Sequence, residues 1–277
     1  MTRKFLKDIG FEYFHDNKSL ILQLLSVTKE NVNFSETDLR NMIKITSNFF
    51  DSIANKTTVK NELFGDLKVE DYDTDLEGLS FYKYVSKETY DNFIKKGKFL
   101  LGSLKYYREI EKQSSRDEKE GFCNLLIETS NRSIFTSVIA GFNHYIFCGT
   151  DSVNESTTMI EKFGTVCLKI NSIKGFAEKV KKSIGANKWE LKKVTYSDYK
   201  AYSATQLISD LNGVNPDLSE EFFNYLIKYS FLPSLFCKPT RFAPESELRL
   251  TFEMDKNVKR KMQFDNLGLL HDIEIIK

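Results

Sequence analysis

The stretch FYKYVSKETYDNFIKKGKFLLGSLKYYREIEKQSSRDEKEG, residues 81–121, decides how the rest of the chain can fold. Its first residues are mostly aromatic or β-branched, which predicts a strand. A helix is expected from Ser86, because Ser is a good N-cap, Glu88 stands in the first turn and Gly97 is a typical helix stop. A second strand is expected over residues 98–104. The stretch therefore predicts two strands separated by one helix.

The second strand leads into Tyr106, Tyr107 and Arg108 and then into a polar segment. This segment carries four carboxylates: Glu109, Glu111, Asp117 and Glu120. A packed core needs neither an arginine nor a cluster of carboxylates at the end of a strand, because buried charges are costly unless they are paired. We therefore expect something to be bound near this point.

Length and composition indicate a folded protein of one large domain, or of one domain with a smaller attachment. The chain has 277 residues, of which 41% are hydrophobic, with 23 Phe and 13 Tyr, and this is ample for a packed core. Its 40 basic and 39 acidic residues give a net charge of +1. No overall positive field therefore recruits nucleic acid, although a local basic patch stays compatible with this balance.

The cysteines and the ends of the chain bear on metal binding and location. The chain has 4 Cys, far apart and with no CxxC pair, and only 3 His, so no zinc site is expected. The cysteines are expected to be small buried hydrophobic residues in a reducing compartment. The sequence shows neither a signal-peptide core nor a run of about 18 apolar residues. We expect a cytoplasmic protein without a membrane partner.

Two parts are expected along the chain: a helical accessory unit over residues 1–75 and a strand-rich domain over residues 76–277. Within the first part, residues 18–29 read as an apolar helix, and Ser35 with Asp38 resembles the cap of another. Further strands are expected at 124–130, 133–139, 144–148, 164–170, 190–196, 245–252 and within 262–276. Further helices are expected at 172–184, 201–211 and 219–229. The pattern predicts an α+β fold, with a mixed or antiparallel strand-rich core decorated by helices.

The familiar enzyme motifs are absent. The sequence contains no GxxxxGK[ST], GxGxxG, HExxH or GxSxG, which sets aside P-loop, Rossmann, zincin and α/β-hydrolase functions. Gly149 and Thr150 follow a strand and are expected to form a turn. His144 begins an apolar run and is a secondary candidate, since such a histidine is more often a core or strand-end group than a catalyst.

Lys83 and Tyr84, on the opening strand, are the first candidate site residues. Alternation places Lys83 on the face opposite Tyr84, and an outward lysine on an edge strand explains it equally well. Tyr106, Tyr107 and Arg108 are the second candidate, because tyrosine stacks on flat rings and arginine holds phosphates or carboxylates. An arginine paired at the surface with a neighbouring glutamate is the alternative.

The third candidate is the segment ESELR, residues 245–249. In a strand, Glu245, Glu247 and Arg249 would share one face. Two carboxylates and an arginine side by side are costly unless they are paired or used. This pattern fits either an exposed ladder of salt bridges or a catalytic carboxylate with a helper two residues before it.

These motifs resemble, in their order, a group of uncharacterised bacterial proteins encoded near phage-defence and abortive-infection genes. The shared landmarks are FYKYVS, KKGKFLLGSLKYYREIE, D-x-x-EG, YIFCGT, FGTVCLKINSIKGF, VTYSDY and K-x-x-x-F-x-x-E-x-E-x-R-L, and they span roughly residues 80–255. The group is similar in layout to the ADP-ribosyltransferase fold, which includes toxins and toxin–antitoxin effectors acting on proteins or nucleic acids.

The resemblance implies an enzyme that transfers ADP-ribose from its substrate NAD to a protein or nucleic-acid acceptor, without a metal. It assigns the first-strand role to Lys83 or Tyr84, and it assigns the catalytic carboxylate to Glu247 with Glu245 assisting. It further assigns an aromatic wall to Tyr106 and Tyr107 and a phosphate contact to Arg108. The sequence departs from better-known members, since it has no first-strand Arg or His and no Ser-Thr-Ser triplet.

Two other functions remain open. In the first, the aromatics and Arg108 form a non-catalytic module that recognises nucleic acid or a phage protein. In the second, Glu111, Asp117 and Glu120 hold the metal of a nuclease-like hydrolase, although their spacing fits no established ligand pattern. In either case the N-terminal unit could dock an antitoxin or another regulatory partner.

Overall fold

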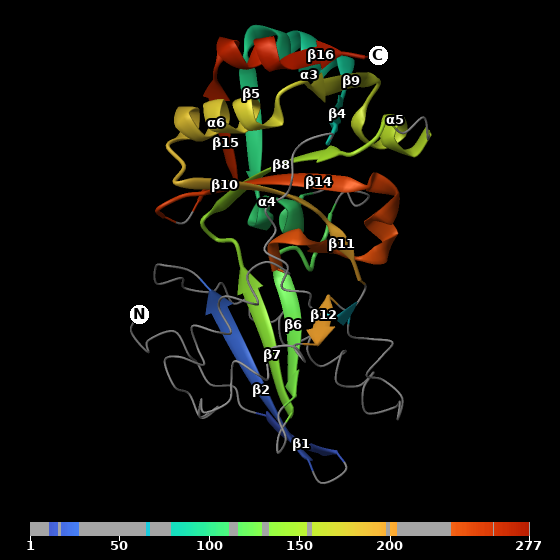
Figure 1. Cartoon of the computed structure of the whole chain (residues 1–277), viewed down its shortest axis with the longest axis vertical. Helices are drawn as coiled ribbons and strands as arrows, with labels where there is room; N and C mark the ends of the chain where they lie inside the picture. The colour runs from blue at the N-terminus through green and yellow to red at the C-terminus, as the bar shows by residue number, and fades with distance from the viewer. Residues whose placement is uncertain are drawn as a thin grey trace. The chain divides into compact units, whose positions relative to one another are not determined.

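The computed structural model describes residues 11–15, 18–27, 65–66, 79–110, 116–128, 133–153, 157–197, 200–203, 234–256 and 258–276 (Figure 1). The chain forms two compact units. Unit 1 contains residues 1–71, 121–141 and 197–239, and unit 2 contains 72–120, 142–196 and 240–277. This grouping differs from the expected division at residue 75, because two later segments join the N-terminal one.

Unit 1 is built on a six-stranded mixed sheet with the strand order β1-β2-β7-β6-β12-β3. The strands are β1 (Phe11–His15), β2 (Lys18–Val27), β3 (Gly65–Asp66), β6 (Phe122–Glu128), β7 (Ser133–Ala140) and β12 (Ala201–Ser203). β2 runs antiparallel to β1 and parallel to β7, and β6 runs antiparallel to β7.

Two helix predictions in unit 1 are wrong. Residues 18–27 form strand β2 where a helix was expected over 18–29. The reason is that a continuous apolar run fits a strand with neighbours on both sides as well as it fits a buried helix, and periodicity does not separate the two. Residues 201–203 form β12 instead of beginning a helix. The helices expected near residue 35 and over 219–229 lie outside the described residues.

Unit 2 is built on an eight-stranded, mainly antiparallel sheet. The main order is β10-β14-β8-β4-β9-β16, and β15 pairs with β5, which pairs with β8. The strands are β4 (Phe81–Val85), β5 (Lys98–Ser103), β8 (His144–Thr150), β9 (Val166–Ile170), β10 (Lys188–Lys193), β14 (Glu247–Glu253), β15 (Lys261–Asp265) and β16 (Ile273–Ile275). The short strand β11 (Thr195–Tyr196) follows β10.

The sheet of unit 2 divides beside β8. Along one edge β8 pairs with β14 over its whole length, from His144 to Thr150. On the other edge β5 pairs with Tyr145 and Ile146, whereas β4 pairs only with Thr150. Residues 147–149 therefore lie where β5 and β4 separate, and this opening positions the candidate site.

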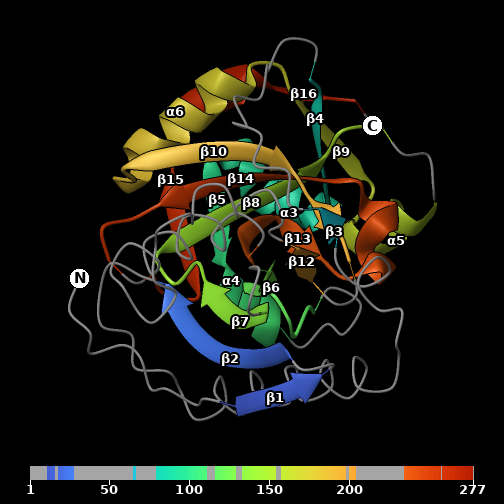
Figure 2. The same cartoon turned by 60° about the horizontal axis from the view of Figure 1, so that its bottom comes forward.

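The helices of unit 2 follow from local sequence signals. They are α3 (Lys87–Asn92), η2 (Ile94–Lys96), α4 (Leu104–Glu109), α5 (Thr157–Phe163), α6 (Ile173–Ile184), η4 (Thr240–Glu245) and η5 (Leu267–Asp272). Ser86 caps α3 as predicted, by accepting from the Thr89 N–H, and Gly97 ends η2 with φ 70°. α6 packs its apolar face against the sheet near β10 and β15 (Figures 1 and 2).

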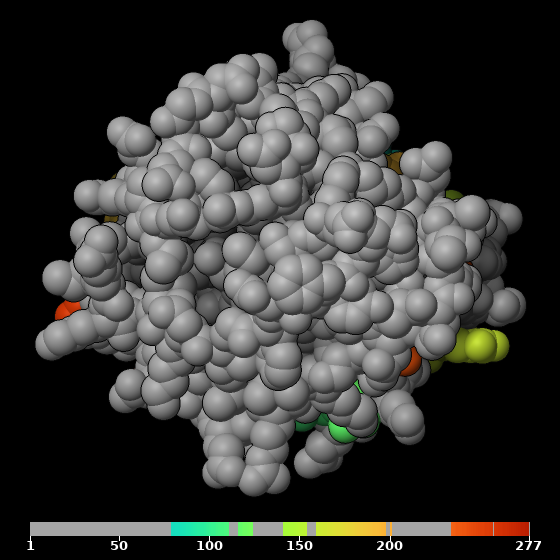
Figure 3. Space-filling view, turned by 90° about the horizontal axis from the view of Figure 1, so that it is seen from below, coloured from blue at the N-terminus to red at the C-terminus, as the bar shows by residue number. Residues whose placement is uncertain are grey.

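The described part confirms a mixed α/β chain with a curled, mainly antiparallel sheet, compatible with the expected α+β class. Residues 81–103 confirm the predicted strand–helix–strand order, while residues 104–109 form a helix that the sequence reading did not predict. Among the described residues, no helix has both the length and the apolar character needed to cross a bilayer. On the face drawn in Figure 3, described residues reach the surface only in a few small, separate places.

Candidate active site

β14 carries the central residues of the site. Both of its faces are buried, with Leu248, Leu250 and Phe252 in the hydrophobic core and Glu247 and Arg249 on the opposite side. The exposed fractions of Glu247 and Arg249 are 3% and 1%. The alternative of an exposed salt-bridge ladder is therefore wrong, because these charges are withdrawn from solvent.

Glu245 does not share that face, so the expectation that it lies beside Glu247 is wrong. It is the last residue of η4, and the next residue, Ser246, has φ 42°, which turns the chain before β14 begins. The Glu245 carboxylate forms an ion pair with the ammonium group of Lys162 on α5. The structure therefore directs Glu245 to a different neighbour.

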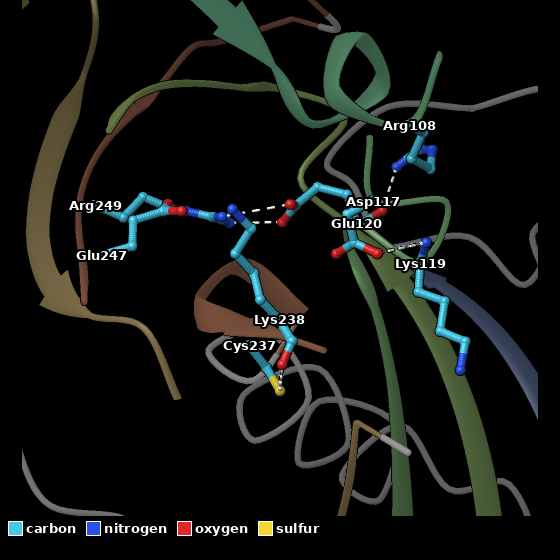
Figure 4. A network of polar contacts seen from close by, with 8 residues as sticks. All are labelled: Arg108, Asp117, Lys119, Glu120, Cys237, Lys238, Glu247 and Arg249. Carbon is cyan, nitrogen blue, oxygen red and sulfur yellow. Dashed lines mark hydrogen bonds and ion pairs between the residues drawn. The ribbon is translucent and has the colours of Figure 1, made fainter. Parts of the chain in front are cut away.

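Arg249 joins two carboxylates (Figure 4). Its Nε donates to Oε1 of Glu247 at 2.7 Å. Its Nη1 and Nη2 donate to Oε1 and Oε2 of Glu120, at 2.6 and 3.4 Å. Burial alone would lower the pKa of Arg249, but the two carboxylates outweigh it and hold the pKa well above its ordinary value. The guanidinium therefore stays charged, and its hydrogen bonds to the two carboxylates fix the orientation of its plane.

The backbone of Glu120 is fixed by hydrogen bonds within unit 2. Its N–H donates to the Asp117 carbonyl at 3.0 Å. Its carbonyl accepts from Nη1 of Arg108 at 2.7 Å. Arg108 is buried at 7% exposure, so the alternative of a surface arginine paired with a neighbouring glutamate is wrong. The structure places Arg108 against the backbone that carries Glu120.

The backbone of Glu247 is fixed in a similar way. Its N–H donates to the hydroxyl oxygen of Tyr196 at 2.8 Å. Its carbonyl accepts from the Val194 N–H at 2.9 Å. Together with the Arg249 contact, these bonds hold both the main chain and the carboxylate of Glu247.

Thr150 lies next to Glu247 and was missed as a site residue. The register pairs Thr150 with Glu247 on one side and with Tyr82 on the other, which makes a row across β14, β8 and β4. Thr150 is fully buried, and its hydroxyl has no hydrogen-bond partner within the described part of the chain. Thr150 is the last residue of strand β8, where a turn was expected. Extending the alternation of HYIFC by two residues would have placed Thr150 on the Cys148 face.

Lys83 lies at the opening between β4 and β5. Its Nζ donates to the Cys148 carbonyl at 2.7 Å and lies 4.2 Å from the centroid of the Phe147 ring. β4 has β8 and β9 as neighbours, so the alternative of an outward lysine on an edge strand is wrong. Burial lowers the pKa of Lys83, and the charges of Cys148 and Glu247 act in the opposite direction.

Tyr84 lies on the same face of β4 as Tyr82, which packs against it. It is on the opposite face of β4 from Lys83, where it packs with Met159 and Cys167 in a separate cluster. Of the two residues proposed for the first-strand role, Lys83 lies within electrostatic range of Glu247.

Tyr106 and Tyr107 belong to α4. Ser103 is the N-cap of this helix, and its Oγ accepts a hydrogen bond from the Tyr106 N–H at 3.1 Å. Their ring centroids are 5.1 Å apart. A Cβ at Gly102 would lie 2.6 Å from the Tyr107 ring, so this glycine admits the ring against β5. Burial raises the pKa of Tyr107 well above its ordinary value, and the charges of Cys148 and Glu247 add to this. Tyr106 instead lies under the Lys261 ammonium, 4.4 Å from its ring centroid.

The structure therefore brings together some of the predicted site residues and separates others. Lys83, Tyr107 and Glu247 form one electrostatic neighbourhood with Arg249. Glu245 and Tyr84 have other neighbours. Sequence reasoning missed Glu120 as a partner of Arg249, because nothing local relates residues 129 positions apart.

Metal binding finds no support in the part of the chain that the structure describes, where no three His, Cys, Asp or Glu residues are grouped to hold an ion. Glu111, one of the proposed ligands, lies outside the described residues. The buried His144 shares a hydrogen bond of 2.8 Å with Asn143 Oδ1.

Compared with protein-family models, curated proteins and solved structures, the chain matches none of them.

The arrangement has a definite chemical capability. A buried carboxylate with a fixed orientation can accept a hydrogen bond from a ligand hydroxyl and stabilise a nearby positive charge. The Thr150 hydroxyl, which has no partner among the described residues, lies in the same row and can donate to or accept from a polar ligand group. Tyr82, Lys83, Cys148 and Gly149, beside the point where β4 and β5 separate, are each partly exposed.

Proposed function

We propose that this protein is an ADP-ribosyltransferase, in which Glu247 is the catalytic carboxylate that acts on NAD. The observation that carries the proposal is the buried Glu247 carboxylate, which Arg249 holds at 2.7 Å beside Thr150, with Lys83 and Tyr107 within electrostatic range. The resemblance assigns the catalytic carboxylate to Glu247, and it names Lys83 as one of two residues for the first-strand role and Tyr107 as one of two residues of the aromatic wall.

In this reaction the bond between the ribose C1′ and the nicotinamide nitrogen breaks, and its electron pair leaves with nicotinamide. The ribose passes through an oxocarbenium-like state, as in glycoside cleavage. Glu247 would accept a hydrogen bond from the ribose 2′-OH and stabilise the positive charge as it develops. The acceptor then supplies an electron pair to C1′ and loses a proton.

Several features of this chain suit NAD as the substrate. Thr150 supplies a buried hydroxyl beside Glu247, with no hydrogen-bond partner among the residues that the structure describes, where a ribose hydroxyl would need a partner. Tyr107 supplies an aromatic ring for nicotinamide. The Lys83 ammonium group has three N–H donors, and one of them donates to the Cys148 carbonyl oxygen. Its other donors allow Lys83 to contact the diphosphate as well. We do not assign the diphosphate contact to Arg108, because Arg108 is buried and its Nη1 donates to the Glu120 carbonyl oxygen.

The biological role that we propose is that of a toxin or defence effector that modifies a macromolecule. Its support is the resemblance to proteins encoded near phage-defence genes. Inducible expression in bacteria is expected to arrest growth with the wild-type chain and not with Glu247→Gln. Equal arrest by both chains would contradict the proposed catalytic role of Glu247.

The acceptor class is tested with NAD labelled in the adenylate moiety and a cell lysate treated with RNase, DNase or protease. Glu253→Gln is a matched control, since Glu253 lies on the same strand as Glu247 but at its far end. Transfer of label by wild type and Glu253→Gln, but not by Glu247→Gln, is expected, and the nuclease or protease that removes it identifies the acceptor. Folded protein that consumes no NAD in any fraction would instead favour a non-catalytic binding module.

A further inference from the structure

The contacts of Glu120 point to a role that the sequence motif around Glu247 does not contain. Glu120 is 1% exposed and lies before β6, whereas Glu247 and Arg249 lie on β14. The Arg249 guanidinium lies between the two carboxylates, with Nε toward Glu247 and both Nη groups toward Glu120 (Figure 4).

We propose that Glu120 and Arg249 form a positioning pair that fixes the orientation of the Glu247 carboxylate and maintains the negative potential around it. The inference rests on the proposed function, because it names residues that serve the same catalytic carboxylate. Neither Glu120 nor Arg249 is proposed to touch the substrate.

Glu120 fixes the orientation of the Arg249 guanidinium. A guanidinium is planar, with its N–H donors in a rigid fork. Because Glu120 engages Nη1 and Nη2, it fixes the plane of Arg249 and thereby the direction of the Nε–H bond to Glu247. The backbone of Glu120 is itself fixed by Asp117 and Arg108, so the reference point is rigid.

Glu120 also has an electrostatic effect on Glu247, through Arg249. A guanidinium bonded to Glu247 alone would cancel much of the negative charge that has to stabilise a developing cation. Because Arg249 is shared with a second carboxylate, less of its positive charge is directed at Glu247. The effective dielectric constant is low in a buried site. The sharing of the Arg249 charge therefore affects the potential at Glu247 more strongly than it would in water.

The alternative is that the three side chains only hold unit 2 together. Buried ion pairs are weak evidence for stability, because desolvation offsets their attraction and apolar residues often replace them without loss. Removing one partner of such a group also leaves a buried charge unpaired, so folding and catalysis have to be measured separately.

The test compares Glu120→Gln with the matched control Glu109→Gln in the full-length protein. Glu109 is an exposed glutamate that pairs with Arg260 and Lys105 outside the site. NAD cleavage is measured per folded molecule, with the folded fraction taken from circular dichroism. Glu120→Gln is expected to lower kcat about 10- to 100-fold and leave KM within about threefold, while Glu109→Gln matches wild type. Wild-type kcat per folded molecule in Glu120→Gln would overturn the electrostatic role.

A second readout does not depend on NAD. The Nε–H resonance of Arg249, assigned with Arg249→Lys, reports how the guanidinium is held. It is expected to shift or broaden in Glu120→Gln and to stay in place in Glu109→Gln. An unchanged resonance would overturn the positioning role, even if wild type did not cleave NAD, whereas absence of cleavage by wild type alone would remove only the proposed function.

Discussion

Glu245 and Glu247 are two residues apart in the sequence but belong to different elements: Glu245 ends η4, and Glu247 begins β14. The positive φ of Ser246 between them separates their side chains. Glu245 pairs with Lys162, while Glu247 contacts Arg249. The two glutamates of the E-x-E motif are therefore expected to respond differently to the same substitution.

Glu245→Gln is expected to lower the free energy of unfolding by about 1–3 kcal/mol, because it leaves the Lys162 ammonium without its carboxylate in a mostly buried place. NAD cleavage per folded molecule is expected to stay within about twofold of wild type. Urea unfolding and an NAD assay on the same preparation check both statements. Loss of cleavage without loss of stability would restore the assisting role implied by the resemblance.

Local signals in the sequence were sufficient for much of unit 2. The cap at Ser86, the stop at Gly97 and the alternation of β14 depend on neighbours in the sequence, and each is found in the structure. The strand β2 was missed because its apolar run is compatible with either element until its neighbours β1 and β7 are known. The turn at Ser246 was missed because a serine with positive φ has no strong sequence signal.

Gly149→Ala is expected to destabilise the protein by about 1–3 kcal/mol or more, because overpacking forces the neighbours to move. A Cβ at this position would lie 2.2 Å from the Phe81 ring and 2.5 Å from the Tyr82 carbonyl oxygen. Thermal or urea unfolding measures the change.

Gly185→Ala is the control for this substitution. No described residue lies within 4 Å of a Cβ added at Gly185, although its φ of 70° disfavours alanine. A cost of only about 1 kcal/mol is expected from the backbone alone. An equal or larger cost than at Gly149 would contradict the close packing of Phe81 on β8.

Thr150→Val is expected to separate stability from function. Valine has nearly the shape of threonine and removes a buried hydroxyl without a partner in the described part, so the free energy of unfolding should rise by about 1 kcal/mol. NAD cleavage should fall about 10-fold or more if the hydroxyl contacts the substrate. A less stable protein with unchanged cleavage would show that the hydroxyl has a structural partner.

Lys83 makes stability depend on pH in a defined direction. Burial lowers its pKa below the ordinary value of 10.5, so in the window between the folded pKa and 10.5 the unfolded chain binds more protons. The free energy of unfolding of wild type relative to Lys83→Met should therefore rise with pH in that window, by at most about 1.4 kcal/mol per pH unit. Urea titrations at several pH values between about 7 and 10 measure this difference. A difference that falls with rising pH would mean that the partners of Lys83 outweigh its burial.

The candidate site was only partly predictable, and its residues show why. Lys83 and Glu247 are recognisable in the sequence because they are charged residues in predicted strands, and Tyr107 because it follows a predicted strand directly after another tyrosine. Their convergence and the contribution of Glu120 depend on strand order and on a contact between residues 129 positions apart. Lys83 and Tyr84 lie on opposite faces of β4, and both faces of this strand are packed. Whether a face is packed depends on the neighbouring strands and helices, which the local sequence does not specify.

The central claim is that Glu247 is the carboxylate that cleaves NAD. The most direct measurement is the release of nicotinamide from NAD by purified wild type, Glu247→Gln and Glu253→Gln, with folding checked by circular dichroism. The account predicts release by wild type and by Glu253→Gln, and a rate lower by at least about 100-fold in folded Glu247→Gln. Release by Glu247→Gln at the wild-type rate, or no release by folded wild type, would contradict it.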